Sequence, residues 1–439
     1  MTSSRQLSRM ILCLLAILSA LACYANGQSK EPIDPGQTAL QHGDYLFAET
    51  LYRQALLQNP GSPELLTDLG IALQMQGRST DAIHTFEQAS KLKNLPRTYA
   101  LLAEEKCKTR DLDGARPMLK KIIRDYAGDE KTIAIVAPCY LDLDEPADAV
   151  RAYTALLRDQ DYPHDLALIQ LAKSYMAAAQ YFVAKLEQRS DGNSYLTALN
   201  QASTSGDPRS AFPVAERASR NFHADLGFDA VLTIWHQHQD DPALLYQLAV
   251  IGGEQHIRQI ELCTQQYPDS PYLAQLRFEI LADQGREDEA VIGFERLLDS
   301  HPELPDLRHD LGMLLRKQHQ WDMALAVFRD EISANPNDER AAARLSEALD
   351  QLLRWTELRD FLRPRLQQAK TPPLWATLDL SEALEQLGES LEAIALLSNA
   401  ESEFPSSRAV HFRLLHLYRG IGEKPKVFAE ADWLKSHPG

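Results

Sequence analysis

The feature that most limits the fold is a pattern of small and aromatic residues that returns every 34 residues. The stretch from His42 to Pro60 has a copy from Gln76 to Asn94. Residues of the same kind recur in the two: Gly43 and Gly77, Ala48 and Ala82, Tyr52 and Phe86, Ala55 and Ala89. Self-similarity at a fixed period of this length is typical of repeat architectures. One such unit cannot bury its apolar face alone, so several units must stack on one another.

Each copy is predicted to form two helices joined by a tight turn. Leu66, Leu69 and Leu73 lie at helical spacing in the first helix. Gly77 takes the turn, where glycine accepts a positive φ at little cost. In the second helix, alanines let neighbouring helices approach closely, and the aromatic side chain fills the space beside them. A proline then follows the second helix in several copies: Pro60, Pro302, Pro336 and Pro405.

The pattern continues through residues 36–163 and 271–439 and resembles the tetratricopeptide repeat (TPR) family. In the second stretch, Ala290 and Phe294 are followed 34 residues later by Ala324 and Phe328. The resemblance implies an all-α fold, a superhelical solenoid of antiparallel helix pairs whose inner face is formed mostly by first helices. We therefore expect TPR-like repeats in 34–164 and 271–439. The short first helix between Asp34 and Gln41 makes the first unit an incomplete one.

The residues between these two stretches, 165–270, depart from the pattern. Pro213 stands near a predicted helix start, and the Gly252-Gly253 pair is predicted to be a shortened turn between two helices. We expect degenerate helical repeats here, within one elongated domain. A small inserted helical module remains the alternative.

The N-terminal residues are predicted to be an export signal rather than part of the fold. Arg5 and Arg9 precede an apolar run, from Met10 to Ala22, that is too short to span a bilayer. We assign residues 1–25 to a signal peptide and expect an exported protein of the periplasm or cell envelope. Cys23 follows "SALA", a loose lipoprotein box. Lipidation of Cys23 and ordinary cleavage after Ala22 or Ala25 both remain open, and a lipid would be the chain's contact with a membrane.

Charge and cysteine content exclude several classes of function. The formal net charge is −17 and is spread along the chain, which argues against binding nucleic acid or anionic membranes. Beyond the signal region lie Cys107, Cys139 and Cys263, too few for a disulfide framework. Whether Cys107 and Cys139 pair stays open. No Cys/His pattern indicates zinc, so the sequence predicts no metal and no cofactor.

No catalytic motif is present, so we expect a protein that is not an enzyme. Nucleophile-elbow, phosphate-binding, dinucleotide-binding and zinc-protease motifs are all missing from the sequence. An enzyme or enzyme subunit with a site in 165–270 is the alternative. It is motivated by the aromatic residues of that region: Phe212, Phe222, Phe228 and Tyr246.

The TPR resemblance implies that ligands contact first-helix residues in a concave groove. Matching the register places His309, Arg316, Arg340 and Glu347 there as candidate binding residues. Two guanidinium groups suit a carboxylate, but the simpler expectation is that Arg316 and Arg340 are solvated or paired with Glu347 and Asp350. The clamp of chaperone-binding TPR proteins is missing. The sequence thus predicts an exported scaffold that binds a peptide or protein partner in envelope assembly or secretion, with a structural spacer as a further alternative.

Overall fold

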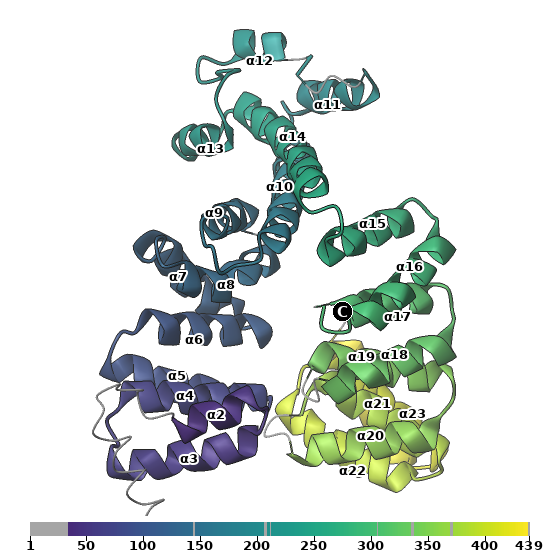
Figure 1. Cartoon of the computed structure of the whole chain (residues 1–439). Coiled ribbons are helices and arrows are strands. Elements are labelled where there is room, and N and C mark those ends of the chain that lie inside the picture. Colours follow the sequence, from purple (N-terminus) through teal and green to yellow (C-terminus); the bar gives the residue numbers. More distant parts are fainter. Residues whose placement is uncertain are drawn as a thin grey trace, which may run out of the picture. The chain divides into compact units, whose positions relative to one another are not determined.

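The computed structural model describes residues 34–143, 145–205, 209–210, 212–304, 306–334, 338–368 and 372–437. These residues form α-helices, labelled α2 to α24, and no strand (Figure 1). The predicted all-α fold of antiparallel helix pairs is therefore confirmed. The predicted signal peptide, Cys23 included, lies outside the described residues. Among the residues that are described, no helix combines the length and the apolar character that a bilayer span requires.

The chain divides into two compact units, Met1–Asn94 and Leu95–Gly439. The described part of the first unit holds two helix pairs. Asp34, Asp44 and Ser62 cap three of its helices through their side-chain oxygens, and proline at the first or second position favours two of those starts. The helices are α2 (Pro35–Gln41), α3 (Tyr45–Gln58), α4 (Pro63–Met75) and α5 (Ser79–Leu92). The short α2 agrees with the predicted incomplete first repeat.

The second unit begins with two more helix pairs of similar length. They are α6 (Pro96–Lys108), α7 (Leu112–Asp125), α8 (Glu130–Asp142) and α9 (Pro146–Leu156). Buried side chains of α8 and α9, among them Tyr140 and Tyr153, fill the space between neighbouring helices. The Tyr140 hydroxyl donates a hydrogen bond of 2.9 Å to the Leu119 carbonyl of α7, which satisfies its one polar atom inside the core.

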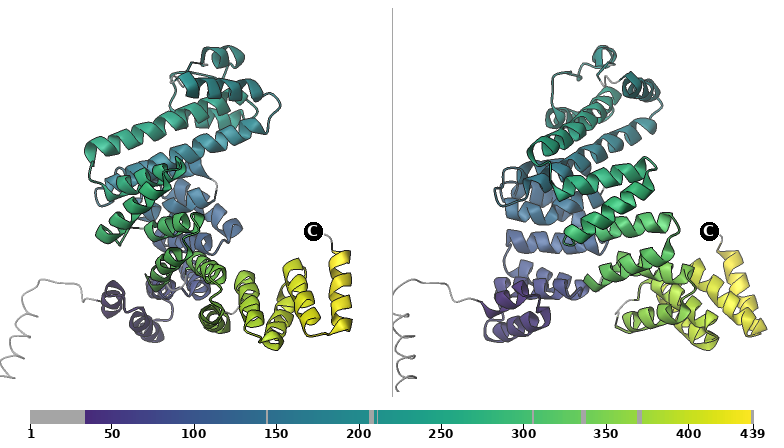
Figure 2. Two further views of the ribbon diagram at one scale, coloured as in Figure 1. Left: turned by 90° about the vertical axis from the view of Figure 1, so that its right-hand side faces the viewer. Right: turned by 45° about the vertical axis from the view of Figure 1, so that its right-hand side comes forward.

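The middle of the second unit contains two helices of about twice the usual length. These are α10 (His164–Glu187) and α14 (Pro242–Gln266), which lie side by side in Figure 2. Three shorter helices connect them: α11 (Asn193–Ser205), α12 (Phe212–Ala218) and α13 (Phe228–Gln237). The predicted turn at Gly252-Gly253 is wrong, because α14 runs through both residues. A Cβ at Gly252 would lie 3.0 Å from the Tyr175 carbonyl oxygen and 3.1 Å from Ala179 Cβ, so glycine here permits close helix packing.

Five regular helix pairs follow. They comprise α15 (Pro271–Asp283), α16 (Glu287–Ser300), α17 (Leu307–Lys317), α18 (Trp321–Ala334), α19 (Glu339–Gln351), α20 (Trp355–Gln368), α21 (Leu374–Gln386), α22 (Ser390–Glu403), α23 (Arg408–Gly420) and α24 (Lys424–Ser436). Trp321 and Trp355 each open a second helix and pack against the shared apolar core. This agrees with the structural role that their spacing of 34 residues suggests.

The turn inside most helix pairs holds one residue in the left-handed region. Glycine takes this position at Gly43, Gly77, Gly285, Gly388 and Gly422, and Arg110, His319 and Leu353 take the equivalent place in other turns. At Gly77 the following amide, that of Arg78, donates to the Leu73 carbonyl at 3.0 Å. Such a bond satisfies one of the carbonyls that the helix end leaves open.

A second glycine position lets the aromatic side chain enter the pair. Cβ atoms added at Gly70 and Gly312 would each lie 2.4 Å from the ring of the aromatic residue sixteen positions later, Phe86 and Phe328 respectively. Both rings are fully buried, as are Ala82 and Ala324 beside them. The predicted packing of small and aromatic residues is therefore confirmed in these repeats.

Candidate functional site

Polar side chains connect successive first helices of the second unit in a continuous series. Lys173 of α10 donates to Glu279 of α15 at 2.8 Å, and Gln275 of α15 donates to Asp310 of α17 at 2.9 Å. The series continues through Arg316 and Glu347 (α17 to α19), Ser346 and Asp379 (α19 to α21), and Arg413, His416 and Glu385 (α21 to α23). We call this series the inter-repeat ladder. It shows that the polar sides of these helices adjoin one another, as the TPR resemblance implies.

The structure brings Arg316 and Glu347 together. The Nε and Nη2 atoms of Arg316 both donate to Glu347 Oε1, at 2.9 and 2.8 Å. Arg344, one turn before Glu347 on α19, contacts its other carboxylate oxygen at 3.3 Å. One carboxylate thus faces two guanidinium groups, each about one-third exposed. The side chain of Arg316 is directed to Glu347, which agrees with the alternative that it is paired within the array.

His309 lies beside the second helix of its own repeat. Its Nδ1 atom is 3.7 Å from Glu331 Oε1 of α18. The interaction with Glu331 raises the pKa of His309 above its ordinary value, while burial and Arg340 act in the opposite direction. Arg340 is therefore near His309. Its side chain is exposed, and within the described part of the chain its guanidinium has no ion-pair partner.

Asp310 is the most perturbed carboxyl group of the ladder. Burial raises its pKa from 3.8 to about 6, and Glu279 and Asp306 add to that rise. The hydrogen bond from Gln275 and the charge of Lys173 partly oppose it. Burial also raises the pKa of Asp379 and of Asp350. Half-buried acidic groups thus recur along the ladder, on three successive first helices.

The remaining candidates of the sequence lie in the core. Cys107, Cys139 and Cys263 are buried thiols on α6, α8 and α14. Burial raises the pKa of the Cys263 thiol, which keeps it in the unreactive protonated form. The aromatic residues that motivated an enzyme site in 165–270 are at most 5% exposed and pack on one another, as Phe212 does on Phe222 and on Tyr246.

One group of potential ligands was missed by the sequence analysis. The side chains of Glu401, His411 and Glu430 place one ligand atom each within 4.8 Å of one another. They come from three consecutive helices and are separated by ten and nineteen residues. No short motif contains them, so a sequence signal appears only when the repeat register is used to align α22, α23 and α24.

Comparison with known proteins supports the repeat assignment. Residues 39–105 match the family model described as "Tetratricopeptide repeat". No curated protein matches the chain. Solved structures that match include the "Structure of Naa15/Naa10 bound to HypK-THB", at 14% sequence identity and a TM-score of 0.28. That match covers 92% of this chain and 62% of the other, so the chain spans about three fifths of the solved one. At this identity and score the match identifies no binding residue.

Proposed function

We propose that this chain, whose residues 39–105 match the tetratricopeptide-repeat model, is an exported, non-catalytic scaffold that binds a peptide or protein partner along the inter-repeat ladder. Repeat arrays suit this role because they present an extended surface on which single positions vary independently of the fold. The setting we propose is cell-envelope assembly or secretion. The proposal of export depends on the signal-like N-terminal sequence alone.

The observation that carries the proposal is that two guanidinium groups contact the single carboxylate of Glu347. Arg316 and Arg344 both contact this one carboxylate, and exposed Arg340 lies one turn before Arg344 on α19. Guanidinium groups bind carboxylates through paired, charge-assisted hydrogen bonds. We therefore propose that a carboxylate of the partner, from an acidic side chain or a chain terminus, binds at Arg340 and Arg344.

A charge reversal at Arg340 tests the proposed surface. Proteins crosslinked to the chain in native envelopes should include a specific partner. Arg340→Glu should reduce its capture at least about tenfold, since one charge-assisted contact contributes roughly 1.5–3 kcal/mol. Arg296→Glu is the matched control, because Arg296 is an exposed arginine on the second helix α16. Equal capture by both variants would contradict binding at the ladder.

The proposed export of the protein is tested in a separate experiment. The mass of the mature protein should show that residues before or near Cys23 have been removed. A mass excess that disappears in Cys23→Ala would identify a lipid anchor. An intact N-terminus on protein from the cytoplasmic fraction would contradict export, without affecting the proposed binding surface.

A further inference from the structure

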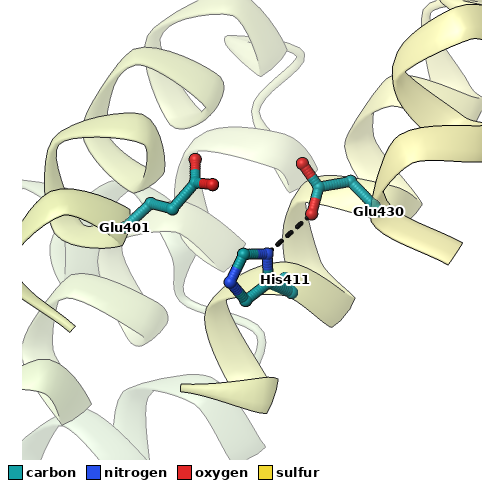
Figure 3. A group of neighbouring side chains, drawn as sticks. All are labelled: Glu401, His411 and Glu430. Carbon is teal, nitrogen blue, oxygen red and sulfur yellow. Dashed lines mark hydrogen bonds and ion pairs between the residues drawn. The ribbon is translucent and has the colours of Figure 1, made fainter. Parts of the chain in front are cut away.

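Three side chains converge where the last three helices meet. Glu401 lies near the end of α22, His411 in the first turn of α23, and Glu430 in α24. Figure 3 shows the two carboxylates pointing toward each other across the imidazole of His411. Their ligand atoms lie within 4.8 Å of one another, and His411 Nδ1 is 2.8 Å from Glu430 Oε2.

The group is largely enclosed and carries more negative than positive charge. His411 is 2% exposed and Glu430 is 9% exposed. Glu401 is half-buried, and among the described residues no cationic side chain pairs with its carboxylate. The nearby Arg408 instead donates to the backbone carbonyls of Leu434 and His437. One imidazole thus lies beside two carboxylates and pairs with that of Glu430 alone, so the group has negative charge that a divalent cation would neutralise.

The surroundings of His411 hold its ring in an orientation that suits a metal ligand. The ring stacks on Trp433, with centroids 3.5 Å apart and an interplanar angle of 19°. Its Nε2 atom faces the Pro405 carbonyl oxygen at 3.4 Å. A histidine ligand usually donates its second ring N–H to such a carbonyl, which fixes the tautomer. With one proton on Nε2, loss of the hydrogen that Nδ1 shares with Glu430 leaves the Nδ1 lone pair directed toward that carboxylate.

We propose that Glu401, His411 and Glu430 form a site for a first-row divalent metal ion of the zinc type. One imidazole nitrogen and two carboxylate oxygens form a ligand set that Zn²⁺ accepts, and Mg²⁺ and Ca²⁺ prefer oxygen alone. Zn–N and Zn–O bonds of ~2.0–2.2 Å at a tetrahedral angle place neighbouring ligand atoms ~3.3 Å apart. His411 Nδ1 and Glu430 Oε2 are 2.8 Å apart, and the three ligand atoms all lie within 4.8 Å of one another, so the group already has nearly the size that a bound ion requires.

Binding exchanges a proton for the ion. The hydrogen that lies between His411 Nδ1 and Glu430 Oε2 leaves to solvent, and the nitrogen lone pair then bonds to the metal. Three protein ligands leave a fourth position, which water fills. The ion joins α22, α23 and α24, so it stabilises the packing of these three helices.

Zinc titration of the untagged full-length chain tests the site. Calorimetry after dialysis against a chelator should show one Zn²⁺ ion bound per chain. Glu401→Gln should weaken this binding more than about tenfold, since changes outside the ligand set alone cost that much. It should leave the circular dichroism unchanged. Co²⁺ should give visible absorption bands in the wild type that Glu401→Gln lacks.

A matched control lies on the same helix. His416 Nδ1 contacts Glu385 Oε1 at 2.9 Å, a histidine–glutamate pair with His416 exposed. His416→Ala should bind Zn²⁺ as the wild type does. Absence of saturable binding would mean that His411 and Glu430 are a buried ion pair only. Wild-type affinity in Glu401→Gln would place the ion elsewhere, and either result overturns the proposed site.

Discussion

At the scale of single residues, the turn between paired helices keeps its left-handed backbone conformation even where the residue in it is not glycine. Leu353 adopts φ 55°, while Gly388 adopts φ 81° in the equivalent turn. This conformation costs a non-glycine residue about 1–2 kcal/mol. Glycine adopts it without that steric cost, although glycine loses more backbone entropy on folding. The side chain of Leu353 is 67% exposed, so it contributes little packing.

Leu353→Gly should therefore stabilise the second unit by about 0.5–1 kcal/mol. Gly388→Ala should destabilise it by about 1 kcal/mol, although no atom lies within 4 Å of the added Cβ. Tryptophan fluorescence during urea unfolding measures both changes. Shifts of the same sign in the two variants would show that something other than the φ angle controls stability at these turns.

At the scale of helices, Asp310 makes the stability of the ladder between neighbouring first helices depend on pH. Burial raises its pKa from 3.8 to about 6, so the folded protein holds the proton more tightly than the unfolded chain. The stability that this proton contributes is fully present below about pH 4 and is lost as the pH rises through about 6. Neighbouring Lys173, Gln275, Glu279 and Asp306 all bear on that value.

Asp310→Asn should remove this pH dependence because the amide stays neutral. Relative to the wild type, the variant should gain about 2 kcal/mol in free energy of unfolding between pH 4 and pH 7.5. Urea unfolding at the two pH values measures the gain. Asp330→Asn, at an exposed aspartate on α18, is the control and should change stability little at either pH. If the free energy of unfolding of Asp310→Asn changed with pH in the same way as that of the wild type, the raised pKa of Asp310 would be contradicted.

Much of the helix arrangement is predictable from the sequence. The helix pairs, the turn position and the alanine–aromatic core were predictable because they arise from contacts inside one 34-residue unit. The continuous α14 was not, because Gly252 serves close packing against α10 rather than a turn. The choice of Glu347 as partner of Arg316 depends on the register between repeats, so it remained one of several alternatives. The convergence of Glu401, His411 and Glu430 depends on three helices at once.

At the scale of the whole molecule, two compact units imply that unfolding is not a single transition. All five tryptophans lie in the second unit, at positions 235, 321, 355, 375 and 433. Tryptophan fluorescence therefore reports that unit alone, whereas circular dichroism reports helices in both. In urea, the two signals should give transitions with different midpoints, because stacked repeats unfold in stages when their local stabilities differ.

A reporter in the first unit completes this experiment. Tyr45→Trp places a tryptophan at a half-buried position of α3. Circular dichroism should show one transition that the native tryptophans do not report. The fluorescence of the added tryptophan should change at the midpoint of that transition. Superimposable curves from all three signals would mean that the two units unfold together.

The inter-repeat ladder also limits how such a chain can grow. Each contact joins side chains that stand 31 to 35 residues apart in α15, α17, α19 and α21. A repeat copied by gene duplication therefore arrives with one half of the contact to each neighbour. If the neighbouring repeats do not carry the matching residues, a carboxylate or guanidinium group of the copy is left without its partner. New repeats are consequently accepted most readily as whole duplicated blocks, and shuffling single repeats within this array would require paired compensating substitutions.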